Sequence, residues 1–306
     1  MPEEPTTPAA GPAALGGTDD VEAALRRVLD RHGFGFQYAV LKKIASLPAD
    51  GPHVPHTWRI EDVESPVRHR GRTTHIDFVL RLVHGKRLLL VAECKRVNPG
   101  FAKWCFVRTP TRDGFRDSVV VAEWLRIDAR RDMGNPQRTG VVGVPIWSNS
   151  ERIYNLPFVL DSDRKAESGG NPREAIDHAL AQAWRGLGGL FALYKEHPEL
   201  LEMGELADTR ALPVIFTTAE LWTSDVDLAA SDLENGKTPH GQATKVQWLW
   251  LKERISLDLK AELSSDTPLD RGLAGYAKGE YARCCAIVTS SGIEEFLRQA
   301  IWSALD

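Results

Sequence analysis

Residues 75–95 have the sequence HIDFVLRLVHGKRLLLVAECK, in which two apolar runs flank the short polar segment His84-Gly85-Lys86. A short segment with a central glycine between two such runs is typical of a β-hairpin. If Gly85 is the midpoint of the turn, the two strands pair in a single antiparallel register. The opposed pairs are then Val83 with Arg87, Leu80 with Leu90, and Asp77 with Glu93.

This register predicts what each face of the hairpin carries, because side chains alternate between the two faces of a strand. One face is expected to be apolar, and its residues are Ile76, Phe78, Leu80, Leu82, Leu88, Leu90, Ala92 and Cys94. The other face carries Asp77, Val79, Arg81, Leu89, Val91 and Glu93, with Lys95 beyond them. A turn one residue shorter or longer would mix the two sets, which supports the register.

Two carboxylates and one ammonium group meet at the open end of this hairpin. Asp77 opposite Glu93 would place two like charges with Cβ atoms about 5 Å apart, an arrangement that favours protonation of one carboxylate or a bound cation. Two carboxylates, a backbone carbonyl such as that of Cys94, and waters suit Mg²⁺, with Mn²⁺ as a substitute. Lys95 can then orient a water or stabilise charge on a phosphate. The alternative is that Lys95 is an ordinary salt-bridge partner of either acid.

Asp77 followed by Glu93-Cys94-Lys95 on the next strand resembles the signature of the PD-(D/E)XK, or restriction-endonuclease-like, nuclease superfamily, with Ile76 in place of the nominal proline. The resemblance implies an α/β fold with an αβββαβ core, a mixed central sheet flanked by helices, and an insertion at 97–172 after the E-x-K strand. It also implies a Mg²⁺-dependent endonuclease that hydrolyses DNA phosphodiester bonds, in restriction or antiviral defence.

The same resemblance implies further residues near the active centre. FGFQYAVLKKI, residues 34–44, is similar to a segment of the Mrr-like branch and puts Gln37 where glutamate is more usual. Glu22 is the other candidate, and either side chain can simply be exposed. Gln182 matches a glutamine that approaches the active centre in the family, although the 97–172 insertion weakens that alignment. LPVIFTTAELW, residues 212–222, resembles the family's next core strand and its partner.

The segment 68–112 is strongly basic within an acidic chain. It holds eleven Lys or Arg residues and two acids, a balance of +9 within a net charge of −4, so the rest carries −13. Such a segment is typical of a phosphate-binding face, and a charged strand edge is the alternative. The candidate nucleic-acid contacts are Arg68, Arg70, Arg72, His75, Arg96, Lys103 and Arg108. For His75 a solvated role is the alternative. For Trp104 and Phe106, which could stack on bases, core packing is the alternative.

Residues 1–18, rich in Pro, Ala, Gly and Thr, are predicted to be a disordered tail, and 19–306 one α/β domain. The predicted helices are Val21–Arg31 (with Val21, Leu25, Val28 and Leu29 on one face), Phe36–Leu47 (with Tyr38, Leu41, Ile44 and Ala45 inward), Ser118–Leu125, Pro172–Glu196 (with Ile176, Leu180, Ala183, Leu187, Leu190 and Phe191 inward) and Gly292–Leu305. The predicted strands are Thr57–Val63, Thr74–Val83, Arg87–Lys95, Leu212–Thr217, Leu221–Val226, Val246–Leu251 and Cys284–Thr289.

Several classes of function are disfavoured. No apolar run is long enough to span a bilayer, and the N-terminus is unlike a signal peptide, so we expect a cytoplasmic protein without a membrane partner. Four cysteines without CxxC spacing favour reduced thiols over zinc. DNA is the expected partner, with RNA left open, and a homodimer would suit cutting both strands, although no segment identifies an interface. The alternatives are an inactive nuclease-fold protein that binds nucleic acid or assembles with partners, and an interaction protein that uses its acidic remainder.

Overall fold

The computed structural model describes residues 18–47, 58–69, 71–83, 88–109, 119–127, 139–148, 150–160, 173–197, 200, 209–254 and 282–299. The predicted tail lies outside these residues except for Thr18, and so do Arg70 and the hairpin turn at 84–87. Among the described helices, none combines the length and the apolar character needed to cross a membrane.

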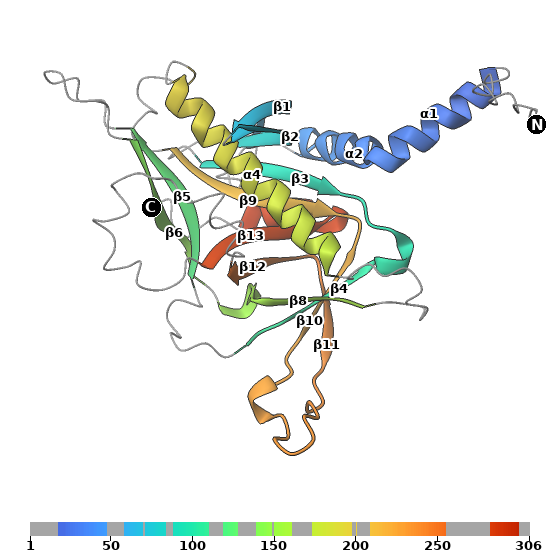
Figure 1. Ribbon diagram of the computed structural model, residues 1–306, viewed down its shortest axis with the longest axis vertical. Coiled ribbons are helices and arrows are strands. Elements are labelled where there is room, and N and C mark those ends of the chain that lie inside the picture. The colour runs from blue at the N-terminus through green and yellow to red at the C-terminus, as the bar shows by residue number, and fades with distance from the viewer. Residues whose placement is uncertain are drawn as a thin grey trace, which may run out of the picture.

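Nine strands of the described residues form one mixed sheet, and its main path runs β1-β2-β3-β9-β13-β12-β7 (Figure 1). The nine are β1 (Trp58–His69), β2 (Arg72–Leu82), β3 (Leu88–Lys95), β5 (Val119–Ile127), β6 (Thr139–Ser148), β7 (Ile153–Tyr154), β9 (Thr209–Thr217), β12 (Trp248–Arg254) and β13 (Ala282–Thr289). Neighbours β1, β2 and β3 are antiparallel, whereas β9 joins β3 in parallel. The predicted α/β class with a mixed sheet is therefore confirmed.

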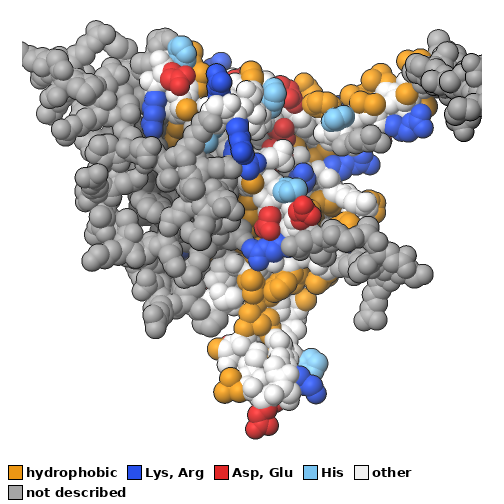
Figure 2. Space-filling view, in the orientation of Figure 1, with side chains coloured by type: hydrophobic (Ala, Val, Ile, Leu, Met, Phe, Trp, Pro, Cys, Tyr) orange, Lys and Arg blue, Asp and Glu red, His pale blue; other side chains and the backbone are white. Residues whose placement is uncertain are grey.

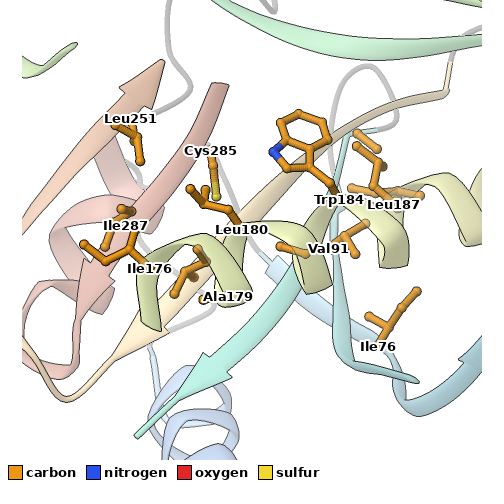
Figure 3. Packing of buried hydrophobic residues seen from close by; sticks show 14 of the residues in the cluster. Ile76, Val91, Ile176, Ala179, Leu180, Trp184, Leu187, Leu251, Cys285 and Ile287 are labelled. Atoms are coloured by element: carbon orange, nitrogen blue, oxygen red, sulfur yellow. The ribbon is translucent and has the colours of Figure 1, made fainter. Parts of the chain in front are cut away.

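Helix α4 (Glu174–Glu196) covers one face of the sheet. All six of its residues predicted to face inward are buried, as expected for an amphipathic helix with apolar residues every three or four positions. Figure 3 shows Leu187 of this helix in the same cluster as Val91 of β3 and Ile287 of β13. The strands beneath α4 are thus held by side-chain packing as well as by their hydrogen bonds.

The opposite face is covered by α2 (Phe34–Ala45) and by the shorter α6 (Ile293–Gln299). The predicted inward residues Leu41 and Ile44 are buried, but the prediction was wrong for Tyr38 and Ala45, which are exposed. The buried stripe of α2 begins at Gln37, a polar residue that hydrophobic periodicity does not count. The helix is therefore rotated relative to the orientation that its apolar residues alone suggest.

The β2–β3 register agrees with the sequence prediction along the paired residues. Phe78 pairs with Ala92, Val79 with Val91, and Leu80 with Leu90. The prediction was wrong for Ile76, which lies in the cluster under α4 and not in the cluster that contains Phe78. The alternation breaks at Asp77, just beyond the Phe78–Ala92 pair, so Ile76 turns to the other face.

The segment 97–172, predicted as an insertion, contributes strands to two sheets. A helix was predicted at Ser118–Leu125, but β5 occupies these residues and pairs with β6 and with the start of β9. Three consecutive valines at its start favour a strand, because β-branched side chains fit a pleated sheet better than a helix. Pairing with a distant strand settled this choice, and the local sequence pattern could not reveal that partner.

A second sheet of four strands has the order β11-β10-β4-β8 among the described residues. Its strands are β4 (Lys103–Val107), β8 (Leu156–Leu160), β10 (Glu220–Ser224) and β11 (Ala243–Val246). The strand predicted at Leu221–Val226 was expected to pair with the strand at Leu212–Thr217. This prediction was wrong, because β10 pairs with β4 and β11. One strand was predicted at Val246–Leu251, but these residues belong to two strands. β11 ends at Val246, and β12 begins at Trp248.

The contact between α4 and β1 gives a first prediction. A Cβ built on Gly189 of α4 would lie 2.5 Å from Cγ2 of Val67, whereas one built on Gly35 of α2 meets nothing within 4 Å. Gly189→Ala should lower the free energy of unfolding by about 1–3 kcal/mol, because the helix must move off the sheet. Gly35→Ala, the matched control, should leave it unchanged or raise it slightly. Urea denaturation followed by circular dichroism measures both, and equal effects would contradict the packing described.

Candidate active site

Asp77 and Glu93 come together where the β2–β3 ladder ends. The ladder places Phe78 opposite Ala92, so the same register puts Asp77 across from Glu93. The backbone N–H of Cys94 donates a hydrogen bond to Oδ2 of Asp77 over 2.5 Å, which fixes the Asp77 carboxylate against β3. The juxtaposition expected from the sequence is therefore present in the fold.

Both carboxyl groups lie in surroundings that disfavour their charged forms. Glu93 is buried, with 6% of its surface exposed, and Asp77 is partly buried. Burial is the largest cause that raises the pKa of Glu93 to about 8, and repulsion from Asp77 adds to it. Burial likewise raises the pKa of Asp77 to about 6, although the Cys94 hydrogen bond opposes the shift. A carboxyl pair of this kind favours a shared proton or a bound cation.

Lys95 is the cation of the site. It is partly buried, and its positive charge lowers the pKa of both Asp77 and Glu93, which places its ammonium group close to both carboxylates. Its effect does not cancel the effect of burial, since both pKa values stay raised. The ion-pair role that was the alternative for Lys95 and the role toward a phosphate are both compatible with this position.

Gln37 joins the site from α2. Its side chain is 3% exposed, and its Nε2 atom donates to the backbone carbonyl of Asp77 over 3.0 Å and to Oε1 of Glu64 over 2.5 Å. The alternative of an exposed Gln37 is therefore wrong, and the sequence prediction that this residue lies at the site is supported. Glu22, the other candidate, is exposed on α1 (Thr18–His32).

Glu64 of β1 is a member of the site that the sequence analysis missed. Val63 pairs with Phe78 and Ser65 with Ile76, which puts Glu64 across from Asp77. Its negative charge raises the pKa of Asp77 and of Glu93. The first strand was predicted to end at Val63, one residue before Glu64 and ahead of the sequence Ser65-Pro66. Gly71 offered a usable signal in the sequence. A hairpin turn at Arg70-Gly71 would place Glu64 directly opposite Asp77.

Glu64 also has an unusual backbone conformation, with φ of 54° in the left-handed region. Outside glycine this region costs free energy, and such residues persist where the surrounding structure holds them. Here the bond from Gln37 and the pairing of β1 with β2 on both sides of Glu64 supply that restraint. The strained residue lies beside the carboxyl pair, as strained residues often do at functional sites.

The donor set fits a hard divalent cation such as Mg²⁺. The carboxylates of Asp77 and Glu93 and the adjacent peptide of Cys94 offer oxygen atoms, which Mg²⁺ prefers to nitrogen or sulfur. Within the part of the chain that the structure describes, no three His, Cys, Asp or Glu side chains converge as a ready-made metal site. The predicted ligands of the cation are only two carboxylates, one backbone carbonyl and waters. Burial raises the pKa of the Cys94 thiol well above its usual value, so the Cys94 sulfur is a poor ligand here.

Gln182, the candidate glutamine of α4, is exposed. It lies on the exposed side of α4, next to the buried Ala183 and Trp184, and it makes no hydrogen bond within the described ranges. The helix was predicted correctly, but its inward stripe is used for packing on the sheet. The approach of Gln182 to the carboxyl pair stays a prediction.

The candidate phosphate-binding residues are spread over several elements. Arg68 and Arg72 lie near the turn between β1 and β2, and His75 is exposed two residues before Asp77. Lys103 is exposed at the start of β4. Arg70 lies outside the described residues. The described candidates Arg68, Arg72, His75 and Lys103 thus lie on β1, β2 and β4, and their role in phosphate binding stays a prediction.

Two of the candidate arginines already have partners within the protein. Arg96 donates from Nη1 to the backbone carbonyl of Asp30 over 2.7 Å, and Arg108 donates from Nε to the carbonyl of Ile153 over 3.1 Å. Arg108 also lies over the ring of Tyr154. Trp104 and Phe106 are fully buried, which confirms core packing as their role.

Comparison with known proteins gives no relative on which to base an assignment: no family model, curated protein or solved structure matches the chain. What the site can do chemically is therefore argued from its own groups. These are the partly buried Asp77, the buried Glu93, the ammonium group of Lys95, and the supporting Gln37 and Glu64.

The raised pKa values give a prediction for stability. Because folding raises the pKa of Asp77 to about 6 and of Glu93 to about 8, the stability that these groups contribute is present below about pH 4 and is lost as pH rises through those values. Without divalent cations, Glu93→Gln should therefore be more stable than wild type at pH 8, by roughly 1–2 kcal/mol, and gain little at pH 4.

Urea denaturation in a metal chelator at both pH values measures this difference. Glu234→Gln, a change at an exposed acid in the loop between β10 and β11, is the control and should show no such pH dependence. A Glu93→Gln variant that is less stable than wild type at pH 8 would mean that the Glu93 carboxylate is well compensated.

Proposed function

We propose that the chain is a divalent-cation-dependent nuclease that hydrolyses DNA phosphodiester bonds, with Asp77, Glu93 and Lys95 as its catalytic residues. The observation that carries the proposal is the meeting of two repelling carboxyl groups, one buried and one partly buried, with one lysine at the end of a single strand pair. Keeping two acids in such surroundings costs stability, which is typical of a site retained for function.

The order of elements around the site supports a restriction-endonuclease-like core. Helix α2, strands β1, β2 and β3, helix α4 and strand β9 follow the αβββαβ order that the resemblance implies. The parallel pairing of β9 with β3 and the position of α4 across β1, β2 and β3 agree with that arrangement. We therefore propose membership of the PD-(D/E)XK superfamily, and restriction or antiviral defence as the setting that this membership suggests.

Each group at the site has a chemical role in this proposal. The carboxylates of Asp77 and Glu93, with the carbonyl of Cys94, would hold a Mg²⁺ ion, which supplies positive charge to the phosphate and acidifies a bound water. Lys95 orients the attacking water and stabilises negative charge on the phosphate oxygens. Hydrolysis forms a bond from the water oxygen to phosphorus and breaks the bond to one sugar oxygen, which takes up a proton. Gln37 is a positioning residue, since it holds the Asp77 backbone and the Glu64 carboxylate.

Activity assays test the three catalytic assignments. Asp77→Asn, Glu93→Gln and Lys95→Ala should each slow cleavage of plasmid and of single-stranded DNA in Mg²⁺ by about 100-fold or more, the effect expected when one positioned charged group is removed. Lys237→Ala, at an exposed lysine in the β10–β11 loop, should cleave at the wild-type rate. If wild-type protein binds DNA but does not cut it, whichever divalent cation is added, an inactive nucleic-acid-binding module replaces the proposal.

Thermal stability gives a test that does not depend on activity. Mn²⁺ or Ca²⁺ should raise the melting temperature of wild-type protein at pH 8, because a cation offsets the repulsion between the two carboxylates and binds only the folded state. Asp77→Asn and Glu93→Gln should each lose most of this increase, whereas Glu234→Gln should keep it. A cation-induced increase of the same size in all four proteins would place the bound cation elsewhere.

A further inference from the structure

Glu64 stands at the point where β1 and β2 both change face. Val63 packs against the cluster that contains Phe78, whereas Val67 lies in the cluster under α4, although strand alternation would put both valines on one side. Strand β2 changes face beside it, at Asp77. The ladder between the two strands has paired residues on both sides of Glu64 and Asp77 but does not pair these two. The two acids therefore occupy a gap in the ladder.

The polar groups of this gap are bound by Gln37. Its Nε2 atom donates to the carbonyl of Asp77 over 3.0 Å and to Oε1 of Glu64 over 2.5 Å. Among the described residues Gln37 is the one donor to Glu64, so the second oxygen of that carboxylate, Oε2, accepts no bond from them. Glu64 and Asp77 are partly exposed, and Figure 2 shows acidic side chains at the surface between α4 and the arm formed by α1 and α2. A hydrated ligand can therefore reach the open oxygen of Glu64.

The backbone conformation of Glu64 does not itself call for a glutamate. Its φ of 54° lies in the left-handed region, which glycine, asparagine and aspartate adopt at lower cost. Any of these three residues would turn β1 over at this point. A glutamate adds a carboxylate on a longer side chain, which reaches Gln37 and leaves one oxygen free.

The charges at the site balance one divalent cation only when Glu64 is included. In their ionised forms, the carboxylates of Glu64, Asp77 and Glu93 carry three negative charges, and Lys95 carries one positive charge. The balance is −2, whereas without Glu64 a divalent cation would leave an excess of positive charge. Beyond the effect of burial, the charge of Glu64 raises the pKa of both Asp77 and Glu93, so its field reaches both carboxyl groups.

We infer that Glu64 is a positioning residue for the bound cation, which it holds through a cation-bound water. Within the described ranges, no three acidic side chains converge closely enough to bind one ion directly. Mg²⁺ keeps several of its waters in proteins, and a water bound to a cation is a stronger hydrogen-bond donor than a free one. The open oxygen of Glu64 accepts from such a water. The inference rests on the proposed cation site at Asp77 and Glu93, and it adds to that site an acid from a third strand.

Calorimetric titration of Mn²⁺ into the full chain at pH 8 tests this role. Glu64→Gln keeps the length of the side chain and an oxygen that accepts the bond from Gln37, but it removes the charge. It should weaken Mn²⁺ binding about tenfold, the effect of one lost hydrogen bond to a charged group. Asp77→Asn, which removes a direct ligand, should abolish measurable binding. Asp62→Asn, the matched control, removes the same charge from an exposed position on the same strand and should bind like wild type.

Thermal melting in a metal chelator at pH 8 separates this role from a purely structural one. Glu64→Gln should melt no lower than wild type, because it removes a repelling charge and keeps the bond from Gln37. A lower melting temperature would mean that the carboxylate serves the fold, and the inference fails. A Glu64→Gln variant that binds Mn²⁺ as tightly as wild type, while Asp77→Asn has lost binding, overturns the inference and leaves the proposed cation site intact. If wild-type protein binds no Mn²⁺, the proposed site and the inference fall together.

Discussion

The pairing of β2 with β3 is the contact on which the rest of the structure depends. Val79, Leu89 and Val91 face α4, whereas Phe78, Leu80 and Leu90 face α2 and α6. With both faces buried, a shift of one residue in the register would exchange the residues between the two clusters and disturb the packing of every covering helix. The same register brings Asp77 to Glu93. Core packing and the geometry of the site are thus set by one strand pair.

At the candidate site, this well-packed sheet holds acidic side chains that lower the stability of the fold. Burial raises the pKa of Asp77 to about 6 and of Glu93 to about 8, and Glu64 adds a third negative charge. Glu64 also has a positive φ, a conformation that costs free energy outside glycine. Three elements converge to hold this arrangement, because Gln37 of α2 bonds to both Glu64 of β1 and Asp77 of β2. The surrounding packing offsets the cost of the acidic cluster.

The elements outside this centre differ in how they are held. The second sheet continues directly from the site, because the peptide after Thr217 bonds to the carbonyl of Lys95 and Glu220 bonds to Ala102. Trp104 and Phe106 anchor it in the core under α4. Helix α1, in contrast, is held at one end through Asp30, and its apolar stripe is exposed. The second sheet therefore shares the main core, whereas α1 leaves its apolar side exposed.

The sequence by itself determined the β2–β3 register, the meeting of Asp77 and Glu93, and the buried side of α4. These features follow from local periodicity, since strand alternation and helix spacing are properties of neighbouring residues. Only the tertiary structure decided that Gln37 bonds to Glu64 and to the carbonyl of Asp77, that 119–127 is a strand and that Tyr38 faces solvent. Each of these depends on a partner far away in the chain, as Gln37 and Asp77 are 40 residues apart. A residue's own neighbours carry no information about such a partner. The resemblance placed Gln37 near the site, but only the folded chain shows that its side chain bonds to Glu64 and to the Asp77 carbonyl.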